Sequence, residues 1–422
     1  MRLGSALARL SAAGLSAALL AACSPSSTTT QSTSTSSAAP VAAAAGNVIK
    51  IGVELPLSGG DASNGIPTRN GVILAVEESN KTAIPGGFSY AVDDLDDAVQ
   101  GKHDPALGAQ NTKTFISDAA VLAMVGPFNS NVAKAEIPLT NDAQLTQISP
   151  SNTSNGLTQG DDGRKLRTSH PELNSFFRVC TTDDHQGAAD AAFAKKLGFK
   201  AVFIVDDNET YGKGLADVFE AQFKKGGGTV LGHEHLNAGQ TDFKALLTKA
   251  QNLRPDVVFF GGTTVSGGGL LRKQMGDSAL KTVAYVGGDG ISDDTFLKTA
   301  GTMANGSYYT VAAPETSKLA SAKTFVANYK KRFGVDVGPY SANAYTAAMI
   351  EIAAINKAIT AAGNKMPARV DVTKGVAATK GFVSPIGTVG FDANGDTTAP
   401  ILSLYKISGG KAVFVDQVNL KT

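Results

Sequence analysis

The chain has 422 residues, of which 42% are hydrophobic and 18% are charged, so it can build a sizeable core and is neither wholly disordered nor collagen-like. Lysine and arginine together number 38 against 37 aspartates and glutamates. The resulting formal net charge of +1 gives no overall attraction to nucleic acid or to an anionic membrane, and two cysteines cannot form a disulfide scaffold.

The first 23 residues have the features of an export signal. Arg2 and Arg9 give a positively charged start, and residues 10–22 form an uncharged run shorter than the roughly 20 residues that span a bilayer. The run ends in Leu-Ala-Ala-Cys at residues 20–23, which resembles a bacterial lipoprotein processing site. We therefore predict a lipoprotein signal peptide over residues 1–23 with lipid on Cys23. An ordinary signal peptide with an incidental cysteine is the alternative.

Residues 24–46 are rich in Ser, Thr, Ala and Pro. They lack the large apolar side chains whose burial would offset the loss of chain entropy, so we predict a disordered tether. No later apolar run is long enough to cross a membrane. The sequence therefore predicts an extracytoplasmic domain, in the periplasm or at the cell surface, that is held at the membrane through lipid on Cys23.

From residue 47 onward, apolar strands alternate with polar loops and helical patterns. Such uninterrupted apolar strands are typical of parallel sheets with helices on both faces. The predicted strands in this part span residues 48–53, 88–94, 121–126, 201–205, 257–260 and 283–286. Helical patterns are predicted at 68–80, 318–333 and 341–362, and late strands at 388–391 and 401–407.

The alternation of strands and helices runs twice, once over residues 47–150 and once over residues 188–290. The intervening stretch, 151–182, is rich in loops and has no clear period. This organisation favours two similar α/β lobes over a single large sheet. Because ligands of open parallel sheets bind beyond the carboxyl ends of the strands, we expect the function to lie in the loops that follow them.

The loops that follow the predicted strands are neutral and polar. In the loop at residues 126–131, Asn129, Ser130 and Asn131 precede a helical pattern and can cap it. A helix start also presents free N–H groups and the positive end of the helix dipole, which suit a carboxylate or phosphate. For any single loop, capping and chain reversal alone remain the alternative explanation. Similar polar loops lie at 58–60, 149–153 and 261–264.

Asp289 stands among glycines directly after the predicted strand 283–286. A carboxylate in this position can accept a charge-assisted hydrogen bond from a ligand ammonium, which contributes about 1.5–3 kcal/mol. Tyr211 opens a helical pattern and can close over a ligand. The alternatives are a helix cap or turn for Asp289 and simple packing for Tyr211.

Signals for catalysis and for metal binding are weak. The sequence contains neither a G-x-S-x-G nucleophile motif nor a G-x-x-x-x-G-K-[ST] phosphate loop. His233 and His235 would share one face of a strand, but no further Cys or His cluster completes a zinc site. We therefore predict that the protein is not an enzyme and has no cofactor and no metal site.

Several different short motifs also follow one another along the chain in a characteristic order and spacing. They are Ile49-Lys50-Ile51-Gly52-Val53 with Leu57-Ser58-Gly59, Ile148-Ser149-Pro150-Ser151-Asn152-Thr153, Phe177-Arg178 with Asp183, Gln186 and Gly187, Tyr211-Gly212-Lys213-Gly214, and Gly287-Gly288-Asp289-Gly290. Together they resemble the substrate-binding proteins of branched-chain amino acid type ABC transporters. The resemblance covers nearly all of the chain from residue 48 onward.

This resemblance implies a type I periplasmic binding protein of the α/β class, with two Rossmann-like lobes that have parallel central sheets and are joined by a three-crossover hinge. The crossings would lie near Val179, Val311 and Gly387. The N-terminal lobe would comprise residues 47–179 and 312–386. The C-terminal lobe would comprise residues 180–311 and 387–422.

The resemblance also implies a set of ligand contacts. Ser130 and donors at Ser151, Asn152 and Thr153 would hold a ligand carboxylate. Asp289 would meet the ligand ammonium, with help from Thr153 and from Tyr211, and Tyr340 would form an aromatic wall.

Two pocket positions depart from the family pattern. The family often has aromatic residues where this chain has Asn64 and Thr263. Polar linings favour a more polar ligand, because a buried donor without a partner is costly. His103 and Asn129 stand where the family has an N-lobe disulfide, and residues 155–172 form an inserted segment.

The sequence thus predicts an extracytoplasmic solute-binding receptor. It would capture an amino acid or a related small polar zwitterion by hinge closure, without chemical change, and deliver it to ABC permease subunits in the membrane. We expect a monomer that binds no nucleic acid and contacts the membrane only through its lipid. A ligand-sensing receptor of a signalling system is the alternative, and a secreted lipoprotein hydrolase is a further one.

Overall fold

The computed structural model describes residues 47–420. The predicted signal peptide, the tether up to residue 46 and Cys23 therefore lie outside the described residues. Within the described range, none of the helices combines the length and the apolar character that a membrane crossing needs.

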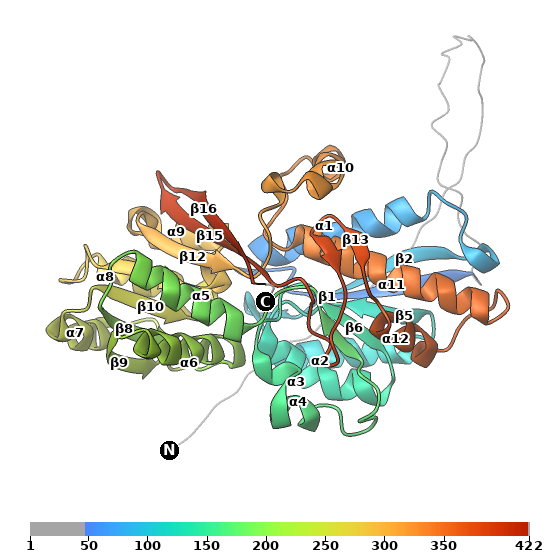
Figure 1. Ribbon diagram of the computed structural model, residues 1–422, viewed down its shortest axis with the longest axis horizontal. Coiled ribbons are helices and arrows are strands. Elements are labelled where there is room, and N and C mark those ends of the chain that lie inside the picture. Colours follow the sequence, from blue (N-terminus) through green and yellow to red (C-terminus); the bar gives the residue numbers. More distant parts are fainter. Residues whose placement is uncertain (1–46, 421–422) are drawn as a thin grey trace, which may run out of the picture. The chain divides into compact units, whose positions relative to one another are not determined.

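The first sheet has five strands in the order β2-β1-β5-β6-β7, and every neighbouring pair is parallel (Figure 1). Its central strands are almost entirely buried, which explains why they read as uninterrupted apolar runs. The strands are β1 (Val48–Leu55), β2 (Ser89–Asp96), β5 (Val121–Val125), β6 (Thr146–Ser149) and β7 (Phe176–Arg178).

The second sheet has seven strands in the order β16-β15-β12-β11-β10-β8-β9. The strands from β9 to β12 are parallel, and β15 and β16 continue the sheet in antiparallel pairing. The strands are β8 (Ala201–Asp206), β9 (Thr229–His235), β10 (Val257–Gly261), β11 (Ala284–Gly287), β12 (Ser307–Val311), β15 (Ile401–Ser408) and β16 (Lys411–Asn419).

Both sheets repeat the same strand order. The first runs 2-1-3-4-5 by sequence, and the second, from β9 to β12, does the same. The prediction of two Rossmann-like α/β lobes is therefore confirmed, and we call each sheet with the helices packed on it a lobe. In this order the second strand lies on one side of the first strand and the third strand lies on the other. The ligand-binding crevice is expected at this switch in strand order, beyond β1 and β5 and beyond β8 and β10.

Helices cover both faces of each sheet, because successive strand residues point to opposite sides. In β8, Val202 and Ile204 pack with α5 and α6, whereas Phe203 and Val205 pack with α7, α8 and α9. The helices of the second lobe are α5 (Asp183–Lys196), α6 (Thr210–Lys225), α7 (Lys244–Leu253), α8 (Gly269–Met275) and α9 (Asp294–Ala300).

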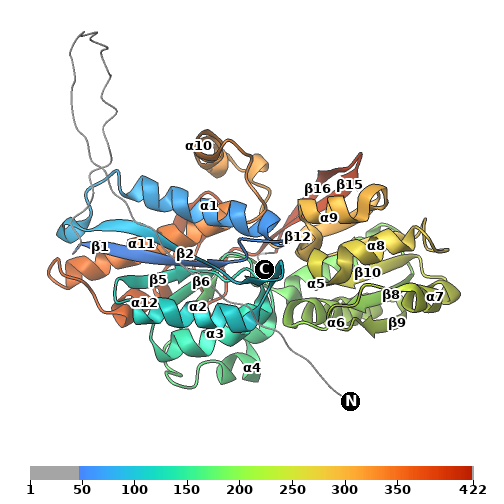
Figure 2. The same cartoon turned by 180° about the vertical axis from the view of Figure 1, so that it is seen from behind.

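In the first lobe, α11 and α12 lie over the sheet in the view of Figure 1, and α2 and α3 lie over it in the opposite view of Figure 2. The helices are α1 (Ala62–Ser79), α2 (Pro105–Ser117), α3 (Ser130–Asp142), α4 (Gly160–Lys165), α10 (Lys323–Phe333), α11 (Ser341–Ala361) and α12 (Arg369–Ala377). Two short hairpins complete the chain, formed by β3 (Ala98–Val99) with β4 (Lys102–His103) and by β13 (Phe382–Ser384) with β14 (Gly387–Val389).

The structure differs from the predicted elements in several places. The first helix begins at Ala62 rather than at residue 68, and β6 and β12 were not among the predicted strands. The loop-rich stretch 151–182 contains α4, the turn η2 (Asn155–Leu157) and β7, which is only three residues long and therefore shows no period in the sequence. The helix expected over 318–333 begins at Lys323, after two short 3₁₀ turns. The strand β16 was not predicted, because most of its residues are exposed and buried and exposed positions do not alternate regularly along it.

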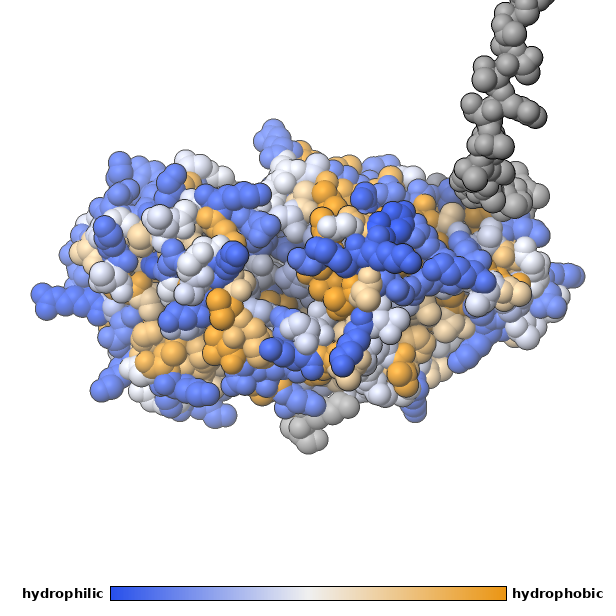
Figure 3. All heavy atoms as spheres, turned by 90° about the horizontal axis from the view of Figure 1, so that it is seen from above, coloured by the Kyte–Doolittle hydropathy of each residue, from blue (hydrophilic) through white to orange (hydrophobic). Residues whose placement is uncertain are grey.

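The outer surface is mixed in polarity. Figure 3 shows hydrophilic residues over much of one face, with hydrophobic residues gathered in patches between them. Such mixing is ordinary for a folded domain and does not by itself mark a binding surface.

Candidate functional site

Apart from Tyr340, the predicted site residues lie beyond the carboxyl ends of parallel strands in the two sheets. Asn64 follows β1, Ser130 follows β5, and residues 151–153 follow β6. In the second lobe, Tyr211 follows β8, Thr263 follows β10 and Asp289 follows β11. All are buried.

Asp289 is the centre of a buried hydrogen-bond network. The hydroxyl of Tyr211 donates to its Oδ1 at 2.7 Å, and the hydroxyl of Tyr340 donates to its Oδ2 at 2.7 Å. The amide of Gln186 donates to Oδ1 at 2.8 Å and also to the hydroxyl of Thr310 at 3.0 Å. The structure thus brings together three of the predicted residues, and it adds Gln186 and Thr310.

The network keeps an acidic group where solvent is almost excluded. Burial raises the pKa of the Asp289 carboxyl above its ordinary value, and the hydrogen bonds from Tyr211, Tyr340 and Gln186 oppose that rise without cancelling it. Burial also raises the pKa of both tyrosines well above the usual range, so both act as donors. The three hydrogen-bond donors stabilise the ionised form of Asp289, and this carboxylate can accept a further hydrogen bond from a cation.

Tyr340 links the two lobes. It precedes α11, which packs in the core of the first lobe, but its ring lies in the core of the second lobe. Phe128 meets this ring edge to face, with the ring centroids 5.5 Å apart. The sequence did not single out Phe128, because a single aromatic residue in a loop gives no periodic signal.

The loop after β6 has a different character from the one expected. The side chains of Ser151 and Asn152 both donate to the main-chain oxygen of Phe128, at 2.9 Å and 2.8 Å. They therefore hold this loop against the loop after β5. By contrast, the hydroxyl of Thr153 is buried without a hydrogen-bond partner among the described residues, and that of Ser130 accepts only a long bond, at 3.4 Å, from the Ser154 amide.

Asp183 is a second buried acid beside this loop. Its amide donates to the Thr153 oxygen at 2.8 Å, while neither carboxyl oxygen has a hydrogen-bond partner within the described part of the chain. Burial raises the pKa of Asp183 to about 8. The sequence placed Asp183 only in the crossing segment, since no pattern reveals how completely a carboxyl will be buried.

The remaining two predicted residues are engaged locally. Thr263 forms a capping box with Ser266 at the start of η3 (Thr264–Gly268), and its amide donates to Asp207 at 3.3 Å. Asn64 lies in the first turn of α1, where its main-chain oxygen accepts a bond from Thr68 at 2.7 Å. Among residues 47–420, no hydrogen bond joins either residue to the Asp289 network.

A group of polar contacts that we call the clasp joins the two lobes beside this site. Glu209, which precedes α6, accepts from three side chains of the first lobe: Lys102 and His103, each at 2.9 Å, and Asn131 at 2.9 Å. The other nitrogen of the His103 ring lies 2.7 Å from Asp61. The clasp therefore places a buried histidine between two carboxylates from different lobes.

Charge explains the protonation of the clasp. Burial alone would lower the pKa of His103, but its hydrogen bonds to Asp61 and Glu209 outweigh burial and raise that pKa to about 10. Burial would raise the pKa of Glu209, but His103 and Lys102 hold it at about 2. At neutral pH the clasp is thus a pair of opposite charges across the lobes.

We expect Glu209→Gln to weaken solute binding about 5- to 30-fold, because it removes a charge-assisted contact worth about 1–2 kcal/mol from the closed arrangement. Calorimetric titration measures the change. Asp217→Asn is the matched control, since Asp217 lies on α6, the helix that Glu209 precedes, and pairs with the exposed Lys213. Equal affinities for the wild type and Glu209→Gln would contradict a role for the clasp in closure.

The clasp also predicts a pH dependence. The pKa of His103 is raised from 6.5 to about 10, so its stabilisation is complete below about pH 6.5 and is lost as the pH rises through about 10. The difference in the free energy of unfolding between the wild type and His103→Gln, measured by denaturant unfolding, should shrink over this range. A difference that stays constant from pH 6 to 10 would refute the prediction.

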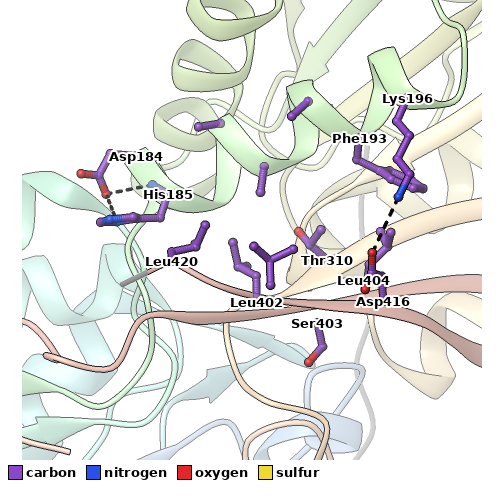
Figure 4. A pocket seen from close by; sticks show the side chains of 14 residues that line it. Asp184, His185, Phe193, Lys196, Thr310, Leu402, Ser403, Leu404, Asp416 and Leu420 are labelled. Atoms are coloured by element: carbon purple, nitrogen blue, oxygen red, sulfur yellow. Dashed lines mark hydrogen bonds and ion pairs between the residues drawn. The ribbon is translucent and has the colours of Figure 1, made fainter. Parts of the chain in front are cut away.

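Two hollows lie near the site but outside it. The one in Figure 4, about 420 Å³, lies between α5 and the strands β15 and β16, and none of the predicted site residues lines it. Its wall includes Thr310, which bonds to Gln186 on the other side. A second hollow, about 560 Å³, lies beside the clasp between the lobes and is lined by Ser154, Glu209 and Lys213 among others.

Two Rossmann-like lobes with a buried, charged and polar site between them define a hinged solute-binding protein, and comparison with known proteins agrees. The family model described as "Periplasmic binding protein" matches residues 48–411. The chain belongs to this family, and the prediction of a branched-chain amino acid type substrate-binding protein is confirmed.

Individual relatives support the assignment. The Leu/Ile/Val-binding protein BraC3 of Rhizobium johnstonii is 31% identical over 366 residues, which cover 86% of this chain and 93% of that protein. A Leu/Ile/Val-binding protein homologue of Brucella melitensis is 29% identical over 373 residues, covering 88% and 95%.

Solved structures are also similar. A leucine-binding protein from Thermotoga maritima has a TM-score of 0.75 at 26% identity, covering 88% of this chain and 99% of that one. A branched-chain amino acid transporter substrate-binding protein from Streptococcus pneumoniae, solved in complex with isoleucine, has a TM-score of 0.75 at 27% identity, covering 88% and 100%.

Proposed function

We propose that this protein captures a small α-amino acid between its lobes and presents it to the permease of an ABC transporter. The observation that carries the proposal is the buried Asp289 carboxylate with its three donors, Tyr211, Tyr340 and Gln186. A carboxylate held in this way suits a ligand ammonium. It also couples the lobes, because Tyr340 and Asp289 come from different ones.

The carboxylate end of the ligand would bind near the start of α3 and the loop after β6. There the Ser130 and Thr153 hydroxyls have unused donor capacity. The 13-residue helix α3 adds free N–H groups and the positive end of its dipole. Ser151 and Asn152 would shape this subsite through their bonds to Phe128 rather than contact the ligand with their side chains.

The class of the ligand side chain is inferred from the relatives and from two pocket residues. The relatives named above are Leu/Ile/Val-binding proteins, whereas Asn64 and Thr263 give this chain polar residues at two pocket positions. We propose an amino acid of this size class, with Leu, Ile and Val as the first candidates and polar amino acids as the second.

We place the lobe crossings near Val179, near Val311 and after Phe391. The third crossing moves from Gly387 because Ile386, Val389 and Phe391 pack in the core of the first lobe. The chain then enters the second sheet at Ile401. Ligand binding would favour the closed arrangement, in which the clasp also forms.

The proposed function includes the location of the protein and its attachment to the membrane. We propose that it acts outside the cytoplasm, that lipid on Cys23 anchors it to the membrane, and that it works as a monomer without catalysing a reaction. Metabolic labelling with a fatty acid tests the anchor, because wild type but not Cys23→Ala should incorporate the label. A receptor that serves signalling without transport is less favoured by the relatives.

A ligand panel tests the central proposal. Thermal-shift screening of amino acids, amides, urea and benzoate should give a rise in melting temperature for at least one α-amino acid, followed by calorimetry of that ligand. Small-angle scattering with and without it should detect closure. Binding of only non-amino-acid solutes, or turnover of a bound ester or amide, would overturn the proposal.

A further inference from the structure

At the outer edge of the second sheet, two histidines and an aspartate converge away from the solute site. β9 is the edge strand and runs parallel to β8, with His235 opposite Asp206 and His233 opposite Ile204. Because His233 and His235 are two residues apart on a strand, their side chains share one face. Asp206 ends β8 and supplies the third group.

The distances within this cluster are short. Asp206 Oδ2 lies 2.7 Å from His233 Nε2 and 2.8 Å from His235 Nδ1. One ligand atom from each of the three residues falls within 4.8 Å of the others. The other Asp206 oxygen accepts from the amide of Asn208 at 2.8 Å, which fixes the carboxylate.

From this convergence we propose that Asp206, His233 and His235 form a binding site for a divalent metal ion of intermediate softness, such as Zn²⁺. Two imidazole nitrogens and one carboxylate oxygen are a ligand set that suits Zn²⁺, Ni²⁺ or Cu²⁺ and not Mg²⁺ or Ca²⁺. Three protein ligands leave a fourth position for water or an exchangeable ligand.

Little movement is needed to admit the metal. Bonds of 2.0–2.1 Å in a tetrahedral centre separate the ligand atoms by about 3.3 Å. The present spacings of 2.7 Å and 2.8 Å must therefore open by about half an ångström. The His235 side chain is 46% exposed and can rotate to do so, whereas Asp206 is fully buried and fixed.

Glu220 supports the proposal as a positioning residue. Its carboxylate lies 2.6 Å from His233 Nδ1, the nitrogen that faces away from Asp206. A carboxylate on the far nitrogen of a histidine fixes the ring orientation and leaves the near nitrogen as the metal ligand. No sequence pattern joins Glu220 and Asp206 to the histidine pair, since Glu220 lies on α6 and Asp206 lies on β8.

The site is tested by titrating the purified protein, without a histidine tag, with Zn²⁺ in a calorimeter and with Co²⁺ in a spectrophotometer. We expect one Zn²⁺ per chain, no competition from Mg²⁺, and visible Co²⁺ absorption typical of tetrahedral coordination. His235→Gln should weaken Zn²⁺ binding at least about tenfold, and the double variant His233→Gln, His235→Gln should abolish it.

The variants separate this site from other causes. His235 is half-exposed, so His235→Gln should melt like the wild type, and His170→Gln, a partly exposed histidine in the first lobe, should bind Zn²⁺ normally. Glu220→Gln should weaken Zn²⁺ binding and alter the Co²⁺ spectrum without abolishing either. Wild type that binds Zn²⁺ no better than Mg²⁺, or Zn²⁺ binding that His235→Gln leaves unchanged, would overturn the proposal. Solute binding is a separate readout and should be unaffected by His235→Gln.

Discussion

Replacing Asp289 with Asn should weaken amino acid binding at least about 30-fold. The substitution keeps the size of the side chain but removes the charge that faces the ligand ammonium, and loss of one partner of a buried charge pair costs about 2–5 kcal/mol. The amide also cannot accept three hydrogen bonds in the geometry that Tyr211, Tyr340 and Gln186 impose. Calorimetric titration with the best amino acid from the panel measures the loss.

Asp293→Asn is the matched control for Asp289→Asn. Asp293 is buried nearby, and burial raises its pKa to about 7, but it caps α9 by accepting from the Phe296 amide at 2.7 Å. Asn caps helices as well as Asp, so folding and affinity should be retained. If Asp289→Asn binds the amino acid normally, the ammonium lies elsewhere. Asp183→Asn then tests the second buried acid.

Arg178→Met should lower the free energy of unfolding by about 3–5 kcal/mol. The Arg178 side chain is fully buried, and its Nε donates to Asp396 at 2.6 Å. It also donates to the main-chain oxygens of Asn152 and Ser154, at 2.9 Å and 2.8 Å, and to the hydroxyl of Thr158. Removing the guanidinium leaves the buried Asp396 carboxylate without its cation, with only the neutral donors Thr158 and Gln159, at 2.8 Å and 2.9 Å. It also removes the Arg178 donor from two buried main-chain oxygens. Denaturant unfolding followed by circular dichroism measures the change.

The control for Arg178 is an arginine with similar chemistry at the surface. Arg332 holds Glu77 through two nitrogens, but its side chain is 50% exposed. Arg332→Met should therefore cost at most about 1 kcal/mol. Equal losses for the two variants would contradict the assigned cost of burial. Arg178→Met should also weaken solute binding, because Arg178 holds the loop that carries Thr153.

Much of the fold could be predicted because the strands at the centre of each sheet are buried on both faces. The apolar runs at 48–53 and 257–260 agree with β1 and β10 for this reason. The three-residue strand β7 could not be found, since it is too short for any pattern. Its position is set by parallel pairing with β6, which is a contact between segments distant in the sequence.

The site was predictable only in part. Loops after strands pointed to the region, and Asp289, Tyr211 and Tyr340 do meet there, but their role in binding stays a prediction. Ser151 shows the limit: its sequence context suggested a ligand donor, whereas its side chain bonds to Phe128. His103 and Asp206 are two further residues whose contacts could not be predicted from the sequence. Each gains its partners from elements far along the chain, and no local pattern reveals such encounters.

The position of Glu209 has a consequence for the timing of transport. Glu209 stands two residues before Tyr211, so the start of α6 carries both a clasp contact and a site residue, and the two must engage and part together. A stronger clasp raises the apparent affinity only until the closed form dominates the population. Beyond that point it merely lengthens the residence time of the solute. On the proposed function, the strength of this one contact would therefore set a compromise between capture of the solute at low concentration and its rapid release.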